Sequence, residues 1–306
     1  MEKTKMDVSV PTTGINDAVL KNRPTVLRED QFAGKVVLVS GGGSGIGRAT
    51  AVLFARLGAT LVLCGRDEEK LASARDLLTG LGAKVTTQAM SIRDPEKVAA
   101  LIDHAWEAHG ALDVLVNNAG GQFAQATIDI RPKGWNAVVD TNLNGTFYMM
   151  QAAARRWRDA GRPGSIVNVV AAIWRGMPQV AHTCAARAGV VFLSKTVATE
   201  WAPLNIRVNC VAPGSIRTEG FGNYSEAGRA SFNQANPMLR SSDPWDIAEA
   251  IAYLSSDAAS FITGETLNVD GGAQNWGDPW FVGRPDYFEL DYAASRLPKA
   301  AKEGAR

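Results

Sequence analysis

The chain has 306 residues, of which 46% are hydrophobic and 21% are charged, and its formal net charge at pH 7 is +1. This balance is typical of a soluble globular protein and gives no support to a nucleic-acid partner, which a basic surface would favour. No apolar run approaches the ~20 residues of a membrane helix. The three cysteines and three histidines follow no ligand or disulfide spacing, so we predict no metal site and expect a reducing compartment.

Strands and helices alternate along most of the sequence. The first strand is expected over 35–40, and the segment "IGRATAVLFARLG" after it has the spacing of a helix. Short apolar runs predict six more strands, over 60–65, 84–90, 112–120, 164–170, 206–214 and 265–272. Runs of this kind are typical of parallel strands that are covered on both faces.

Three more helices are predicted between these strands. "DEEKLASARDLLTGLG" has acidic residues in its first turn, and the next helix has Asp94 as its cap and Pro95 at its first position. A long alanine-rich helix is expected over 181–201. The alternation predicts an α/β fold with a doubly wound parallel sheet of the Rossmann type, in a single domain.

The regular alternation sets the expected domain limits. It begins at residue 34 and continues to 272, so we expect one Rossmann-type domain over 34–272. Residues 1–33 are polar and aperiodic, which predicts an N-terminal extension. Residues 273–306 form an aromatic-rich tail that is expected to cover a substrate pocket or contact a neighbouring subunit, through Trp276, Trp280, Phe281, Tyr287 and Phe288.

A glycine-rich segment, "SGGGSGIG" (40–47), follows the first strand and opens a helix. Gly41 allows the tight turn, while Gly45 and Gly47 let the backbone approach a pyrophosphate and the helix pack on the sheet. The free N–H groups and the dipole of a helix N-terminus favour an anion there. A glycine-rich turn without a ligand is the alternative, which the strand–turn–helix context disfavours.

The spacing G-x-x-x-G-x-G resembles the short-chain dehydrogenase/reductase family. Three further motifs carry the resemblance in the same order: "NNAG" (117–120), Asn142 in "DTNLNGTF", and "RVNCVAPGSIRT" (207–218). The resemblance covers residues 34–272 and implies a nicotinamide cofactor and a homotetramer or homodimer. It also implies the cofactor-binding residues Gly41, Ser44, Gly45, Ile46, Gly47, Arg66, Ser91, Ile92, Asn118, Ala119, Gly120, Arg187, Pro213, Gly214, Ile216 and Thr218.

The end of the second strand is expected to select the cofactor. An acidic residue there accepts a hydrogen bond from the adenosine ribose 2′-OH and repels a 2′-phosphate. This chain has Gly65 and Arg66 instead, and a guanidinium suits a doubly charged phosphate. The sequence therefore favours NADP over NAD. The neighbouring Asp67 weakens the argument, and a solvated surface arginine is the alternative.

The segment "AHTCAARAGV" (181–190) departs from the family pattern. The resemblance implies a tyrosine that gives a proton to the carbonyl oxygen, a lysine that lowers the pKa of that tyrosine, and a serine that polarises the carbonyl. Thr183 stands at the tyrosine position and Arg187 at the lysine position, while positions 170–171, where the serine would fall, are Val-Ala. Of the four groups only Asn142 remains. We predict Asn142, Thr183 and Arg187 as the catalytic set.

The chemistry of this set favours one reaction class. A threonine hydroxyl donates a hydrogen bond but does not readily give up a proton, and an arginine stays charged. Carbonyl reduction makes a basic alkoxide and needs a positioned acid. Reduction of a conjugated C=C bond develops charge on an enolate oxygen, which preorganised donors stabilise while solvent protonates the α-carbon. We therefore predict an enoyl thioester or enone as substrate.

A second resemblance points the same way. "KGWNAVVDTNLNGTFYM", "AHTCAARAGV" and "AASFITGETLNVDGG" resemble peroxisomal trans-2-enoyl-CoA reductase and, less closely, the 2,4-dienoyl-CoA reductases. This implies NADPH-dependent reduction of the trans-2 double bond of an acyl-CoA, with 217–240 as the substrate cover. Because the sequence ends in "EGAR" and not in a peroxisomal address, we expect a cytoplasmic protein. We expect Trp174 to line the pocket, and core or interface packing for Trp135.

Two other functions stay open at this point. The chain resembles bacterial citronellol or citronellal dehydrogenases, so it could oxidise an alcohol or reduce a carbonyl with an unusual acid such as water or His182. It could also be a catalytically silent NADP-binding protein that kept the cofactor site and lost the chemistry.

Overall fold

The computed structural model of the chain describes residues 14–220 and 235–275. Most of the expected substrate cover, the aromatic tail and the first thirteen residues lie outside the described residues. No helix in the described part is long and apolar enough to cross a membrane.

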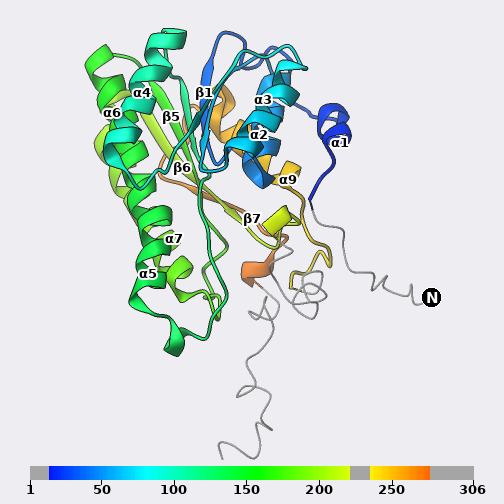
Figure 1. Ribbon diagram of the computed structural model, residues 1–306, viewed down its shortest axis with the longest axis vertical. Helices are drawn as coiled ribbons and strands as arrows, with labels where there is room; N and C mark the ends of the chain where they lie inside the picture. Colours follow the sequence, from blue (N-terminus) through cyan, green and yellow to red (C-terminus); the bar gives the residue numbers. More distant parts are fainter. Residues whose placement is uncertain (1–13, 221–234, 276–306) are drawn as a thin grey trace, which may run out of the picture.

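Seven parallel strands form one sheet in the order β3-β2-β1-β4-β5-β6-β7 (Figure 1). From β1 the chain moves outward to β3, returns to the centre at β4, and then moves outward in the other direction. This confirms the predicted doubly wound parallel sheet. The strands are β1 (Val36–Ser40), β2 (Thr60–Gly65), β3 (Val85–Ala89), β4 (Val114–Asn117), β5 (Gly164–Val169), β6 (Ile206–Pro213) and β7 (Thr266–Val269).

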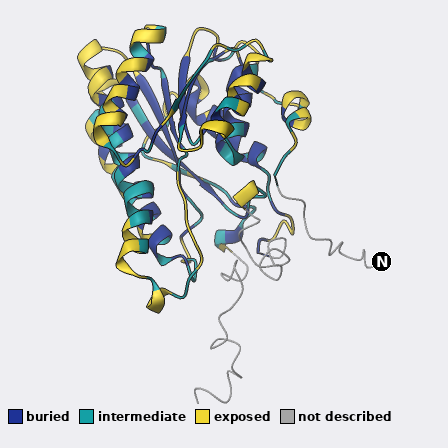
Figure 2. Ribbon diagram, viewed as in Figure 1, coloured by how far each residue is buried: buried dark blue, intermediate teal, exposed yellow. Residues whose placement is uncertain are grey.

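Helices cover both faces of the sheet, and each face has its own apolar core. Buried residues fill the strands and the inward sides of the helices (Figure 2). One face carries α2 (Gly45–Arg56), α3 (Glu68–Thr79) and α9 (Pro244–Ser255). The other carries α4 (Pro95–His109), α6 (Gly145–Ala160) and α7 (Ala181–Trp201). The central strands are buried along their whole length, which explains their apolar sequences.

The order of the strands reverses between β1 and β4. In open α/β sheets ligands bind at the carboxyl ends of the strands on either side of such a reversal. The glycine segment follows β1, and the "NNAG" segment includes the end of β4 and the loop after it. The topology therefore brings the two motifs to one edge of the sheet.

A turn of π-helix, Asp140–Asn144, joins α5 (Pro132–Val139) to α6. The Gly145 N–H donates to the Asp140 carbonyl, which is the wider hydrogen-bond spacing of a π-turn. Such turns are frequent at functional sites because they turn a side chain out of helical register. Here the turned side chain is that of Asn142, which is buried.

The N-terminal segment is more ordered than its polar, aperiodic sequence suggested. Within 1–33, residues Asp17–Asn22 form the short helix α1, and Leu20 is only 1% exposed because it packs into the core on the α2 side. The guanidinium of Arg48 on α2 donates two hydrogen bonds to the Asp17 carboxylate, at 3.1 and 2.8 Å. The buried Leu20 and Phe32 and the ion pairs Asp17–Arg48 and Arg23–Asp243 thus attach this segment to the domain.

We expect the Leu20→Ala variant to lose about 2–4 kcal/mol of unfolding free energy, because the substitution leaves a cavity in a closed core. Urea unfolding followed by circular dichroism measures the change. The matched control is Val19→Ala, since Val19 is 48% exposed and should cost less than about 0.5 kcal/mol. Equal effects of the two substitutions would show that α1 contributes nothing to the core.

Candidate active site

The glycine segment forms a tight cradle between β1 and α2. Gly41 has a φ of 68°, and a Cβ added at Gly47 would lie 2.2 Å from the Gly41 carbonyl oxygen. No side chain larger than glycine fits at Gly47. Ser44 is the N-cap of α2 but makes no capping hydrogen bond, so its hydroxyl and the first N–H groups of the helix remain available to an anion.

Hydrogen bonds hold the "NNAG" segment against this cradle. The Ser40 hydroxyl oxygen accepts from the N–H groups of Asn118 and Ala119, at 3.1 and 3.0 Å. The Asn118 side-chain amide donates to the carbonyls of Ser40 and Gly41, at 3.0 and 3.2 Å. The structure thus brings together predicted residues that are more than seventy positions apart. The sequence analysis did not identify Ser40, although it opens the glycine motif.

Arg187 reaches across from α7 to the same loop. A Cβ added at Gly120 would lie 2.2 Å from Arg187 Nη2 and 3.0 Å from Asn142 Oδ1, so the guanidinium rests directly on the glycine backbone. The Asn142 amide donates to the Gly121 carbonyl and accepts from the Gly121 N–H, both at 3.0 Å. The predicted catalytic Asn142 is therefore occupied in fixing the loop on which Arg187 lies.

The Arg187 guanidinium is buried without an acidic partner among the described residues. It is 7% exposed, and its Nη1 has no hydrogen-bond partner. Burial lowers the pKa of Arg187 to about 10, a value at which it is still protonated at neutral pH. Burial raises the pKa of the neighbouring Cys210 thiol to about 11, so this thiol is neutral and does not compensate the positive charge of Arg187. A buried, unpaired cation is costly unless a ligand compensates it.

Thr183 presents a second buried donor without a partner. The residue is 2% exposed and its hydroxyl makes no hydrogen bond. Most buried polar groups in proteins are satisfied, and an orphan of this kind calls for an explanation such as a missing ligand. Thr183 lies one helical turn before Arg187, so both donors lie on the buried side of α7.

His182 is not placed to act as the missing acid. Its Nδ1 accepts a hydrogen bond from the Thr183 N–H at 2.8 Å, so this nitrogen carries no proton. Burial also lowers the pKa of His182, which keeps the ring neutral at physiological pH. The hydrogen bond at Nδ1 and the lowered pKa therefore argue against His182 as the acid for carbonyl reduction at neutral pH.

The other segments that were predicted to bind the cofactor make contacts with the cradle, with α6 and with one another. A Cβ added at Gly45 would lie 3.3 Å from Thr218 Cγ2, which joins the cradle to the segment after β6. A Cβ added at Gly145 would lie 2.7 Å from Ile92 Cγ1, so the loop after β3 packs on the start of α6. The Pro213 carbonyl accepts from the Ala172 N–H at 2.9 Å, which ties the loop after β5 to β6.

Comparison with known proteins identifies this arrangement. A family model described as Enoyl-(Acyl carrier protein) reductase matches residues 41–274. The chain belongs to the short-chain dehydrogenase/reductase family. It is 38% identical over 251 residues to a probable 2,4-dienoyl-CoA reductase of Bacillus subtilis, a match that covers 80% of this chain and 98% of the relative.

Two further members of the family carry other names. A 3-oxoacyl-[acyl-carrier-protein] reductase of Thermotoga maritima is 36% identical over 79% of this chain and 98% of its own length. The solved structure of a citronellol catabolism dehydrogenase from Pseudomonas aeruginosa has a TM-score of 0.73 and 36% identity, over 82% of this chain and 99% of that one. These identities show the family. They are too similar to distinguish between the substrates for which the three relatives are named.

The end of β2, where the sequence analysis expects the cofactor to be selected, is followed by Asp67 at the start of α3. Asp67 is the N-cap of α3, where its carboxylate accepts from the Lys70 N–H at 3.1 Å and pairs with Lys70 Nζ at 3.3 Å. The hydrogen bond from the Lys70 backbone lowers the pKa of Asp67. The carboxylate is therefore engaged by its own helix, while Arg66 is exposed at the end of β2.

Other predicted residues have structural partners that do not test their role. The Ser91 hydroxyl accepts from the Arg93 N–H at 3.3 Å, and Ile216 pairs with Ser242 in an isolated bridge. Trp174 is 44% exposed and its indole N–H donates to Asn268 at 2.7 Å. Whether these residues bind cofactor or substrate stays a prediction.

A chain of buried polar side chains anchors α7, and the sequence analysis missed it. The Asn117 amide donates to Asn168 at 2.8 Å, and the Asn168 amide donates to the Ser194 hydroxyl at 2.9 Å. Ser194 also accepts from the Cys210 thiol at 3.2 Å. The chain links β4, β5, β6 and α7, and therefore fixes the helix that carries Thr183 and Arg187 against the strands.

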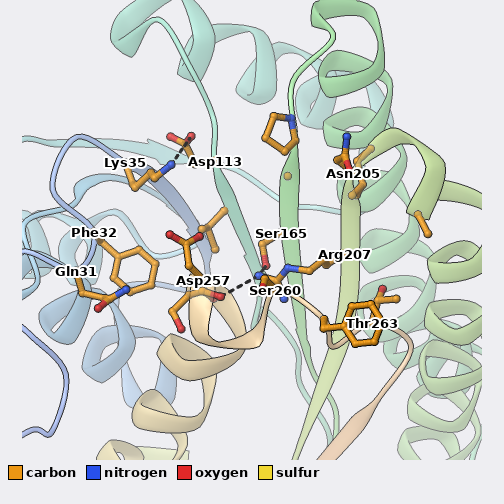
Figure 3. Close-up of a pocket in the computed structure, with 18 residues that line it drawn as sticks. Gln31, Phe32, Lys35, Asp113, Ser165, Asn205, Arg207, Asp257, Ser260 and Thr263 are labelled. Atoms are coloured by element: carbon orange, nitrogen blue, oxygen red, sulfur yellow. Dashed lines mark hydrogen bonds and ion pairs between the residues drawn. The ribbon is translucent and has the colours of Figure 1, made fainter.

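A cavity of about 580 Å³ lies elsewhere in the fold (Figure 3). It opens at the amino ends of β4, β5 and β6, on the opposite edge of the sheet from the glycine cradle. The Arg207 guanidinium at this cavity donates to the carbonyls of Leu254, Ser256 and Ile262 and to the Ser165 hydroxyl, so its hydrogen-bond donors are satisfied by the protein.

Among the described residues no group of His, Cys, Asp and Glu has the arrangement of a metal site.

We expect Gly120→Ala to displace the Arg187 guanidinium and to raise the dissociation constant for the dinucleotide at least about tenfold, which corresponds to about 1.4 kcal/mol. Quenching of protein fluorescence by NADPH or NADH measures it. The control is Gly80→Ala at the end of α3, where an added Cβ meets only carbonyl oxygens at 3.4 Å. Unchanged binding by the Gly120→Ala variant would separate Arg187 from the cofactor.

Proposed function

We propose that this chain reduces an activated carbon–carbon double bond, of a trans-2-enoyl thioester or an enone, with NADPH. One observation carries the proposal: the two catalytic positions of α7 hold buried hydrogen-bond donors without partners, and neither Thr183 nor Arg187 can release a proton at neutral pH. Donors of this kind stabilise a developing oxyanion, but they do not protonate an alkoxide.

The residues present fit a bound nicotinamide dinucleotide. The uncapped start of α2 suits the pyrophosphate, and the orphaned Arg187 Nη1 suits a ribose hydroxyl or the substrate oxygen. Arg66 supplies positive charge for a 2′-phosphate, and Lys70 offsets the negative charge of Asp67 by pairing with its carboxylate. These features support NADP. When bound, the reduced cofactor supplies a hydride.

The protein groups have the following roles in this proposal. The β-carbon of the substrate accepts the hydride, and negative charge develops on the conjugated carbonyl oxygen. The Thr183 hydroxyl donates a hydrogen bond to that oxygen, and the positive charge of Arg187 stabilises it further. Asn142 holds the 120–121 loop under Arg187 through its two hydrogen bonds to Gly121. Water protonates the α-carbon, since Thr183, Arg187 and Asn142 offer no dissociable proton at neutral pH.

The comparisons give this proposal partial support. The family model is named for enoyl reduction, and the Bacillus subtilis relative is named as an enoyl-CoA-producing reductase. The second candidate is oxidation of an alcohol or reduction of a carbonyl, which the names of the citronellol dehydrogenase and the 3-oxoacyl reductase favour. In this chain that reaction needs a proton donor outside Thr183, His182 and Arg187.

We expect the purified protein to oxidise NADPH with crotonyl-CoA or 2-cyclohexenone, and to be slower with NADH and with citronellal. Thr183→Val keeps the shape and removes the donor, so kcat should fall about 10²-fold, the usual effect of one lost oxyanion donor. NADPH oxidation followed at 340 nm measures both. Turnover with citronellal alone would favour the second candidate, and tight NADPH binding without turnover would indicate a catalytically silent protein.

The charge of Arg187 predicts an unusual alkaline limit. Because the cation is the active form and its pKa is about 10, activity should persist through pH 9 and fall as the pH rises through 10. Arg187→Lys should move this limit to lower pH, since burial lowers the pKa of a lysine from an already lower ordinary value of about 10.4. Profiles of kcat/KM against pH measure the shift, and identical limits would show that residue 187 does not set it.

A further inference from the structure

His182 is a buried titratable residue that the proposed reaction does not use. It is 0% exposed and lies at the start of α7, directly before Thr183. Its Nδ1 accepts the Thr183 N–H at 2.8 Å, while the Val180 carbonyl accepts from the same N–H at 2.9 Å. The ring therefore fixes the backbone of the residue whose hydroxyl is the proposed oxyanion donor.

The His182 ring also contacts the loop after β4. The Phe123 ring packs edge-on against it, with 4.6 Å between ring centroids and 65° between planes. Phe123 lies two residues after Gly121, the residue that Asn142 holds. One buried imidazole thus joins α7, which carries Thr183 and Arg187, to the loop that Arg187 and Asn142 contact.

The Phe123 ring lies against Gly134, where the absence of a side chain leaves space for it. A Cβ added at Gly134, on α5, would lie 2.8 Å from Phe123 Cζ. The Phe123 ring contacts both Gly134 and His182, yet Phe123 keeps 39% of its surface exposed. An aromatic ring that is fixed by its neighbours and still partly uncovered is suited to contact an apolar ligand.

We propose that His182 is a positioning residue that holds Thr183 and Phe123 in fixed relation, and that the uncovered part of the Phe123 ring is the wall that selects an apolar substrate tail. The inference rests on the proposed function, because Thr183 is taken as the donor to the substrate oxygen. It adds the class of substrate: an enoyl group with a hydrocarbon chain beyond the reacting carbons.

The neutral form of His182 is the one that can accept the Thr183 N–H. Burial lowers the pKa of His182 from 6.5, and the Phe123 backbone acts in the opposite direction. Among the described residues no ionised side chain is a cause of the shift. The neutral form is present above this pKa, so positioning of Thr183 should be lost only as the pH falls below 6.5 and through the lowered value.

Two substitutions of His182 separate its hydrogen bond to the Thr183 N–H from its contact with the Phe123 ring. Asn places an oxygen where Nδ1 was and should keep the bond to Thr183, but it removes the ring that touches Phe123. Phe keeps the ring and removes the acceptor. We expect His182→Phe to lower kcat about tenfold with the chain-length preference retained, and His182→Asn to keep kcat within about twofold with that preference weakened. The acid limb of the pH profile should be absent in His182→Asn.

Phe123 itself is tested with a series of trans-2-enoyl-CoA esters of increasing chain length. In the wild type kcat/KM should rise by up to about three- to fourfold per added CH2 near the ring, the value for full burial of a methylene. Phe123→Ala should make kcat/KM nearly independent of chain length. Gly134→Ala should change the chain length that is preferred, because the added methyl group displaces the Phe123 ring. The control is Ile128→Ala, since Ile128 is 90% exposed in the same connection and should leave the series unchanged.

Several outcomes would overturn this inference. If His182→Phe and His182→Asn change kcat, chain-length preference and melting temperature in parallel, His182 is only a packing residue. If Phe123→Ala leaves the series as in the wild type, the ring is not a wall of the pocket. The proposed function fails in a different way, through absence of turnover of every enoyl ester by the wild-type protein, whereas failure of this inference leaves that turnover intact.

Discussion

The site depends on one buried contact, the Arg187 guanidinium lying on the backbone of Gly120. It requires a glycine at 120, a loop held by Asn142, and a helix held at a fixed height over the sheet. The π-turn supplies the second condition, and the polar chain from Asn117 to Ser194 supplies the third. An unpaired cation in this position is unfavourable for the fold alone, so its presence is best explained by ligand binding.

The fold could be predicted from the sequence because its signals are local. Apolar runs, glycines after strands and capping residues gave all seven strands and the long helix α7 to within a few residues. The strand after α4 was expected to reach residue 120, but it ends at Asn117, since the Asn118 side chain turns back to bind the carbonyls of Ser40 and Gly41. Helix α1 was missed because a six-residue polar helix with one buried leucine has no periodic signal.

The site could be predicted only in part, for a different physical reason. Sequence motifs identify residues, but they do not show which of their polar atoms are already hydrogen-bonded within the protein. Asn142 was predicted as a member of the catalytic set, and the structure shows that its amide is hydrogen-bonded to Gly121. His182 was considered as an acid, and its Nδ1 accepts a backbone N–H. Such pairings join residues from separate elements, so they become visible only when the fold is assembled.

The buried cation also bears on how long the protein survives in a cell. A ligand that binds only the folded form raises the unfolding free energy by RT ln(1 + [L]/Kd). The hydrogen bonds that the dinucleotide accepts from the buried Arg187 guanidinium enter this expression through a lower Kd, so they increase the gain in unfolding free energy at a given dinucleotide concentration. The abundance of the protein should therefore follow the supply of dinucleotide, with proteolysis removing the empty form first and the loaded form last.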